Sequence, residues 1–127
     1  MEDKVNLNDL KFGDVMELIN MLKGSKAQSK PHPSLGKYVV VRTYAAGVHV
    51  GVLKDYDYIT RHAVLTDSRR IWSWEGAFTL SAVAVDGITG GRIAIPLDEI
   101  MIAQVEEIIP CSSVAESNLR GKEVHKP

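Results

Sequence analysis

The fold is decided by the stretch Tyr38-Val39-Val40-Val41-Arg42-Thr43-Tyr44 and by the run Val48-His49-Val50-Gly51-Val52-Leu53 that follows it. Both runs are rich in β-branched and aromatic residues, which favour strands. Ala46-Gly47 separates them, and two strands around a short turn that contains glycine form a β-hairpin. The sequence therefore predicts a hairpin over residues 38–53.

Beyond the hairpin, short apolar runs bounded by turn residues predict further strands. These strands are Ala63–Thr66, Arg70–Trp74, Arg92–Ile95 and Ile100–Ile109. Asp67-Ser68 is expected to turn the chain between the first two of them. Connections of hairpin length require antiparallel pairing, so we expect a strongly curved, mainly antiparallel sheet.

An N-terminal helix is predicted ahead of the sheet. Asp14 and Glu17 form a variant of the capping box, and Gly24 follows the last periodic apolar residue as a helix stop. Pro31 and Pro33 then exclude helix and favour an extended path. Residues 1–36 are therefore expected to comprise a helix and a connector that contains proline.

Two shorter helices complete the expected fold, which is α+β. Ala77–Val85 is apolar nearly all round, which favours a short buried helix. Ser113 and Glu116 form a second capping box, and they open a C-terminal helix that Gly121 ends. Residues 37–121 are expected to form a β-rich ligand-binding core, with 122–127 as a frayed tail.

Composition bounds the class of protein. The chain has 127 residues, 45% of them hydrophobic, which is ordinary for one globular domain. Its formal charge of −1 gives no electrostatic basis for tight binding to duplex DNA. A single cysteine, Cys111, indicates a reducing compartment. The opening Met-Glu-Asp-Lys is unlike a signal peptide, and no run is apolar enough for a membrane helix, so we expect a cytosolic protein.

Catalytic motifs are not evident in the sequence. The four histidines are scattered, and none forms a metal-ligand spacing with a second ligand. Cys111 follows a proline without the surroundings of an activated thiol, and it is expected to be a half-buried structural residue. We therefore expect a protein that is not an enzyme and that carries no metal or cofactor.

The chain's two tryptophans lie beside an arginine pair in Arg69-Arg70-Ile71-Trp72-Ser73-Trp74. In a strand, Arg70, Trp72 and Trp74 would share one face. Aromatic rings bordered by guanidinium groups suit a nucleobase and its phosphates, because bases stack on rings and arginine binds phosphate bidentately. Packing of the tryptophans in the core and surface ion pairs of the arginines are equally consistent with this pattern.

Candidate polar contacts also lie on the hairpin. Arg42 and Tyr44 share a strand face. His49 is expected opposite Thr43 or Tyr44, depending on the length of the turn. The concentration of arginines in the middle of the chain favours a local pocket for a small anion over an extended basic stripe.

Two blocks of this sequence resemble a known family. The first runs from Lys37 to His49 and contains Arg42-Thr43-Tyr44 and Ala46-Gly47-Val48-His49; the second runs from Leu65 to Ala77 and contains Arg69-Arg70-Ile71-Trp72. Together they resemble the phage-encoded Thoeris anti-defence sponges, and the resemblance extends from the N-terminal helix to Pro110-Cys111.

The resemblance implies a function without catalysis. Proteins of that family bind cyclic ADP-ribose isomers made by bacterial TIR-domain proteins and hold them uncleaved, so that the host effector is not activated. They assemble into oligomers up to hexamers, with nucleotide pockets at subunit interfaces. Some also capture the cyclic di- or trinucleotides of CBASS defence at separate sites. The implied location is the cytoplasm of the infected bacterial host.

Candidate ligand-binding residues follow from this resemblance and from the chemistry of the ligand. Phe78 is the expected adenine stack, with the tryptophans either as its floor or in the subunit core. The full set is Phe78, Arg69, Arg70, Trp72, Trp74, Arg42, Thr43, Tyr44, His49 and Arg120. Lys23 and Lys26 are candidates for the second, cyclic-oligonucleotide site. The alternatives are a small phosphodiesterase that degrades the same signals, and a single-stranded nucleic-acid-binding protein that uses the Arg-Trp face.

Overall fold

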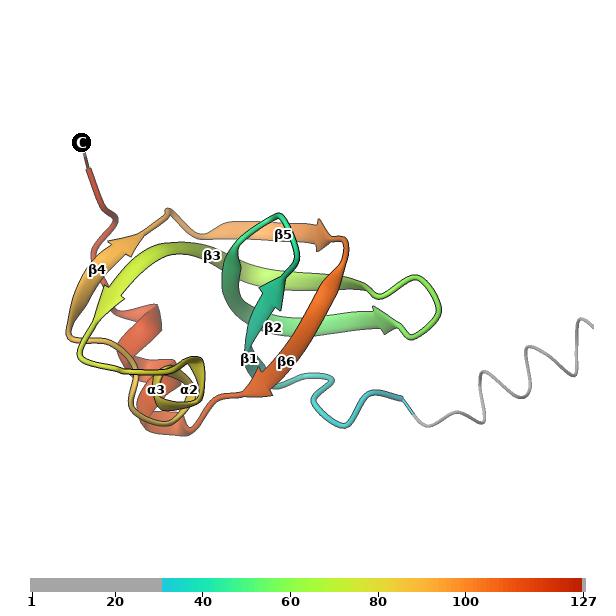
Figure 1. Ribbon diagram of the computed structural model, residues 1–127, viewed down its shortest axis with the longest axis horizontal. Helices are drawn as coiled ribbons and strands as arrows, with labels where there is room; N and C mark the ends of the chain where they lie inside the picture. The colour runs from blue at the N-terminus through green and yellow to red at the C-terminus, as the bar shows by residue number, and fades with distance from the viewer. Residues whose placement is uncertain (1–30, 127) are drawn as a thin grey trace, which may run out of the picture. The chain divides into compact units, whose positions relative to one another are not determined.

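The computed structural model describes residues 31–126 (Figure 1). The predicted N-terminal helix, with Lys23 and Lys26, lies outside these residues. The described residues form six strands and two helices. They are β1 (Tyr38–Thr43), β2 (Val48–Asp57), β3 (His62–Glu75), α2 (Leu80–Asp86), β4 (Gly90–Ile93), β5 (Leu97–Ile102), β6 (Val105–Pro110) and α3 (Ser113–Arg120).

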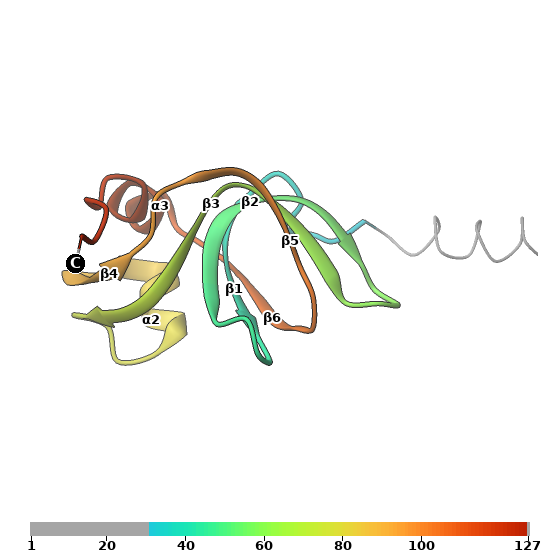
Figure 2. The same cartoon turned by 90° about the horizontal axis from the view of Figure 1, so that it is seen from above.

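All six strands form one antiparallel sheet that curls into a half-barrel (Figure 2). The strand order is β4-β3-β2-β1-β6, and β5 also pairs with β3. The long strand β3 therefore pairs with β5 along its first half and with β4 along its second half. The α+β class, the curved antiparallel sheet and the C-terminal helix are confirmed.

Strand β1, which lies between β2 and β6, is buried on both of its faces. Val39, Val40 and Val41 are each fully buried, although their side chains alternate between opposite sides of the sheet. Val40 packs in a cluster with residues of α2 and α3, which we call the helix-side cluster. Val39 and Val41 pack with Leu53 and other strand residues in a second cluster, which we call the barrel-side cluster. One strand thus joins two hydrophobic cores.

The turn predicted at Asp67-Ser68 is wrong, because β3 is a single continuous strand. Asp67 has a φ of 50° and lies in a β-bulge, where two residues of β3 oppose Gly51 of β2. Aspartate tolerates positive φ better than most residues, a property that serves a turn and a bulge equally. The extra residue reverses the side-chain alternation, so that Ser68 and Arg69 are both buried.

The strand predicted over Ile100–Ile109 is also wrong as a single element. It is interrupted after β5 at Gln104, which has a φ of 54°, and β6 then crosses to pair with β1. The Gln104 carbonyl accepts a hydrogen bond from the Tyr44 amide, which fixes this corner. Glutamine is not a typical turn residue, so the break has no clear signal in the sequence.

Helix α2 begins later than the sequence indicated, and α3 begins earlier. Thr79 caps α2, whose buried residues are only Val83 and Ala84, so this helix is not buried all round. Ser112, rather than Ser113, caps α3, and its hydroxyl also donates to the Val85 carbonyl. That bond joins the two helices. No helix of residues 31–126 is long and apolar enough to cross a membrane.

The C-terminal tail is held against the sheet along part of its length. The His125 amide donates to the Ile93 carbonyl on β4, and Lys122 Nζ donates to the Thr89 carbonyl. The expectation of a frayed tail therefore does not hold at these two positions.

Gly51 provides a test of the bulge. A Cβ at Gly51 would lie 2.8 Å from the Thr66 carbonyl oxygen and 3.1 Å from the Ser68 Cα, both of which are backbone atoms. Gly51→Ala should therefore lower the free energy of unfolding by about 1–3 kcal/mol, as overpacking does. Urea denaturation measures this. Gly90→Ala is the control, because its Cβ meets only the flexible end of Glu75, and equal losses in both variants would contradict the expected close approach.

Candidate functional site

Two cavities flank Arg70 and Trp72 on the surface of the sheet. The first, which we call the apolar cavity, has a volume of about 300 Å³ and is lined by His49, Ser68, Arg70, Trp72, Ala94, Ile95, Leu97 and Ile100. The second, which we call the turn cavity, has a volume of about 390 Å³ and is lined by Ala45, Ala46, Gly47, Val48, Arg70, Ile71, Trp72 and Trp74. Arg70 and Trp72 line both cavities, so the two hollows adjoin each other.

Arg70 and Trp72 are both available to a ligand. Arg70 is exposed, and it makes no ion pair or hydrogen bond through its side chain with any residue of 31–126. Trp72 is 57% exposed, an unusual state for so large an apolar side chain. It is the extra residue of a second bulge, where the pairing of β3 with β4 shifts between Ile71 and Ser73. This geometry is consistent with the prediction that Arg70 and Trp72 lie on one face of the strand.

Trp74 does not share that face fully. Its ring packs against the helix-side cluster, and its Nε1 donates to the Ala77 carbonyl at 3.1 Å. The bulge at Trp72 explains the difference, because an extra residue changes the alternation beyond it. Trp74 still contributes to the lining of the turn cavity.

His49 is a wall of the apolar cavity with a defined tautomer. It is 1% exposed, and its Nε2 lies 2.9 Å from the Ala46 carbonyl oxygen. A carbonyl only accepts, so Nε2 carries the proton and Nδ1 of the neutral ring is an acceptor. Burial lowers the pKa of His49, the bond to Ala46 opposes this, and the charge of Arg70 lowers it further.

The position of His49 differs from the prediction. It pairs with Val41 on β1, not with Thr43 or Tyr44, because the turn of the hairpin occupies residues 44–47. On its other side it pairs with Arg70 of β3. This register places His49 next to Arg70.

Ser68 is a cavity residue that the sequence analysis missed. It is 1% exposed, and its hydroxyl has no hydrogen-bond partner within residues 31–126. A buried hydroxyl without a partner is destabilising, so native proteins seldom retain one. The signal for it was the Asp67-Ser68 pair inside an apolar strand, which was interpreted as a turn.

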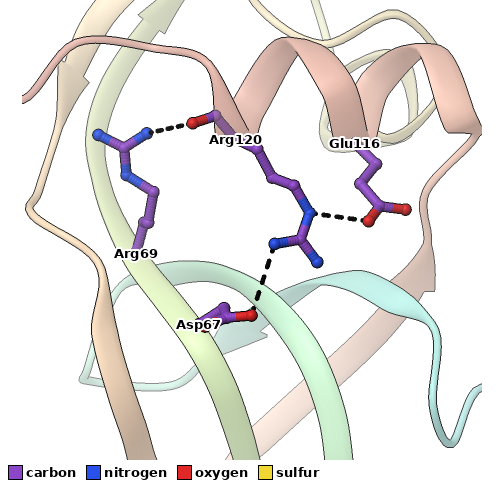
Figure 3. A network of polar contacts seen from close by, with 4 residues as sticks. All are labelled: Asp67, Arg69, Glu116 and Arg120. Atoms are coloured by element: carbon purple, nitrogen blue, oxygen red, sulfur yellow. Dashed lines mark hydrogen bonds and ion pairs between the residues drawn. The ribbon is translucent and has the colours of Figure 1, made fainter.

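Arg69 has a structural role and lines neither cavity. Its side chain is buried, with Nε donating to the Ala94 carbonyl at 2.8 Å and Nη1 to the Leu119 carbonyl at 2.9 Å. A longer contact of 3.4 Å reaches the Arg120 carbonyl (Figure 3). Burial lowers the pKa of Arg69. The two neighbouring arginines of the motif therefore have different roles.

Arg120 and Arg42 are engaged in ion pairs elsewhere. Arg120 contacts Glu116 at 2.8 Å and Asp67 at 3.5 Å, as Figure 3 shows, and its guanidinium lies 4.7 Å from the centre of the Tyr38 ring. Arg42 pairs with Glu107 on β6 at 2.9 Å. Neither arginine lines either of the two cavities.

The remaining candidates are not gathered at the cavities. Phe78 is 99% exposed in the connection between β3 and α2, and Tyr44 is also exposed. Thr43 is buried, and its hydroxyl donates to the Gly47 carbonyl. None of these three lines the apolar cavity or the turn cavity.

Two further groups bear on chemistry. Burial raises the pKa of the Cys111 thiol to about 12, so the thiol stays protonated at neutral pH, in line with a structural role. Within residues 31–126 there is no group of three or more His, Cys, Asp or Glu side chains that could hold a metal ion.

The fold and these cavities define a small α+β protein with a curled antiparallel sheet and an arginine-tryptophan site on its surface. Residues 36–119 match the family described as a domain of unknown function (DUF6948), and the chain belongs to that family. Comparison with curated proteins finds no match, and comparison with solved structures finds none either.

The two neighbouring arginines give contrasting predictions for stability. Arg69→Met removes the donors of two main-chain carbonyls and should lower the free energy of unfolding by roughly 1–3 kcal/mol. Arg70→Met changes an exposed side chain without partners and should stay within about 0.5 kcal/mol of the natural protein. Chemical denaturation measures both. Equal effects would contradict the division of roles.

His49 predicts a pH dependence of stability. Its pKa is lowered in the folded state, so the unfolded state binds the proton more readily below the ordinary value of 6.5. The free energy of unfolding should therefore fall as the pH drops from about 7 to 5. His49→Gln, which keeps a donor for Ala46, should show a shallower fall in the same titration. His32, whose pKa burial also lowers, contributes equally to both curves.

Proposed function

We propose that this protein is a phage-encoded sponge that binds a cyclic ADP-ribose isomer and holds it without cleavage, in the cytoplasm of the infected bacterium. The effector of the host's TIR-based immunity would then remain inactive. The observation that carries the proposal is the guanidinium of Arg70, which has no partner among residues 31–126, beside the half-exposed indole of Trp72 and between two adjoining cavities. The resemblance of the Arg-Thr-Tyr and Arg-Arg-Ile-Trp blocks to the anti-defence sponges points to the same ligand.

The chemistry of this pair fits a nucleotide. The indole of Trp72 offers a flat face, and stacking on an aromatic ring contributes about 1–3 kcal/mol per base. The guanidinium of Arg70 has its donors free, so binding a pyrophosphate breaks no ion pair with the described residues. The cavity volumes, about 300 and 390 Å³, lie at the lower end of the range for small-molecule sites.

Charge supports a small ligand rather than a nucleic-acid polymer. The chain carries a net charge of −1, and Arg42, Arg61 and Arg120 are engaged in ion pairs. A polymer requires a continuous basic surface, because its affinity comes mainly from neutralised phosphates. Arg70, which makes no ion pair with residues 31–126 and lies next to Trp72, provides for one compact anion instead.

The proposed assembly is a homo-oligomer, with a hexamer as the expected form. Phe78 projects from the protomer with almost its whole surface in solvent, as does much of Tyr44. Large exposed aromatic side chains are typical of contact surfaces. In the oligomer, Phe78 would reach a neighbouring protomer and could stack on the adenine there. The proposed second site, for cyclic di- or trinucleotides at Lys23 and Lys26, lies outside the described residues.

Binding and recovery of the ligand test the proposal. Isothermal titration with cyclic ADP-ribose isomers should show tight binding to one of them, in the nanomolar range that sequestration requires, or about −12 kcal/mol. Arg70→Ala should weaken it at least tenfold, since a charge-assisted bond contributes roughly 1.5–3 kcal/mol. Arg92→Ala is the matched control, because Arg92 is exposed and lines neither cavity.

The fate of the ligand separates the sponge from its alternatives. After denaturation of the complex, mass spectrometry should recover the cyclic ligand unchanged. A hydrolysed product would indicate a phosphodiesterase instead. Retention of a single-stranded oligonucleotide with steep salt dependence, and no affinity for the cyclic isomers, would favour the nucleic-acid-binding alternative.

A further inference from the structure

Two residues at the apolar cavity carry buried polar groups that the described part of the fold does not use fully. The Ser68 hydroxyl has no partner within residues 31–126, and Nδ1 of His49 is left as an acceptor by the bond from Nε2 to Ala46. Both residues line the cavity, which otherwise presents mainly apolar side chains. They come from neighbouring strands, β2 and β3, and lie on the same face of the sheet as Leu53 and Leu65.

We infer that the apolar cavity is the base pocket of this site, in which Ser68 and His49 bind the edge of a purine that carries an amino group. The inference rests on the proposed function and specifies which end of the ligand enters which cavity. The base would lie against Trp72 in the apolar cavity, and the phosphates would cross Arg70 towards the turn cavity.

The two polar groups match the edge of adenine. An amino group of the base donates to the acceptor nitrogen of His49, and the Ser68 hydroxyl donates to a ring nitrogen. The surrounding walls, including Ile95, Leu97 and Ile100, are apolar. Pockets of this kind fix the orientation of a ligand with a few polar groups on an apolar lining.

The state of Ser68 supports a role in binding rather than in folding. A hydroxyl at 1% exposure without a partner is unfavourable in the unbound protein. Arg70 lines the same cavity, but no hydrogen bond joins its side chain to the Ser68 hydroxyl. A base that enters the cavity would provide that partner. Binding would then remove the unfavourable free energy of the unpaired Ser68 hydroxyl.

The test compares stability with affinity in one variant. Ser68→Ala should leave the melting temperature unchanged or raise it, because the variant removes an unsatisfied buried group. It should weaken binding of adenosine and of cyclic ADP-ribose by roughly 3- to 10-fold, as expected for one hydrogen bond. Ser73→Ala is the control: Ser73 is exposed on the same strand and lines neither cavity, so both quantities should stay the same.

A spectroscopic measurement tests His49 directly. In long-range ¹H–¹⁵N spectra of the full chain, Nδ1 of His49 should shift upfield when adenosine is added, because it then accepts a hydrogen bond. Ribose 5-phosphate, which has no base, should leave it unchanged. Purine riboside, which lacks the amino group, should bind more weakly than adenosine and should not produce the shift.

The outcomes separate this inference from the function on which it rests. If cyclic ADP-ribose binds but Ser68→Ala affects affinity no more than Ser73→Ala, the base pocket is overturned and the proposed function stands. If Ser68→Ala lowers the melting temperature without changing affinity, the hydroxyl is structural and the inference is again overturned. If adenosine binds in a manner that depends on Ser68 and no cyclic isomer binds, the pocket stands and the sponge function fails. If no probe binds, both fail.

Discussion

The buried guanidinium of Arg69 is the constraint on which the arrangement of this protein depends. It donates to the Ala94 carbonyl after β4 and to the Leu119 carbonyl at the end of α3, so one side chain joins three segments that lie far apart in the sequence. A buried charge requires such hydrogen bonds. Nε and Nη1 make them, whereas the buried Nη2 has no partner among residues 31–126. Because neighbouring residues of a strand face opposite sides, the inward position of Arg69 also directs Arg70 outward. The structural arginine thereby determines where the free arginine lies.

The valines of β1 pack regularly, whereas β3 carries two bulges. Val39, Val40 and Val41 fill two cores from a single strand. Among the irregular features of the sheet, the bulges at Asp67 and at Trp72 both lie on β3. Bulges are frequent beside functional sites, where they redirect side chains. Their coincidence with the cavities is what distinguishes this face of the sheet from the rest of the surface.

The sequence predicted the hairpin and the fold class well, because β-branched runs and the turn around Gly47 are strong local signals. It also placed Arg70 and Trp72 together. It could not separate Arg69 from Arg70, since the partners of Arg69, Ala94 and Leu119, depend on tertiary packing. Ser68 was missed for a related reason. An Asp-Ser pair has the same local preference in a turn as in a bulge, and only strand pairing decides between them.

The bulge at Asp67 has a consequence for how this family can vary. Before it, odd-numbered residues such as Leu65 face the barrel-side cluster; after it, even-numbered residues such as Ser68 face that side. Deleting one residue at the bulge would give a regular ladder in which Arg69 still pairs with Val50. The same deletion elsewhere in β3 would instead shift the register and turn the remainder of the strand over. Descendants of this gene should therefore tolerate substitutions along β3 far better than changes in its length.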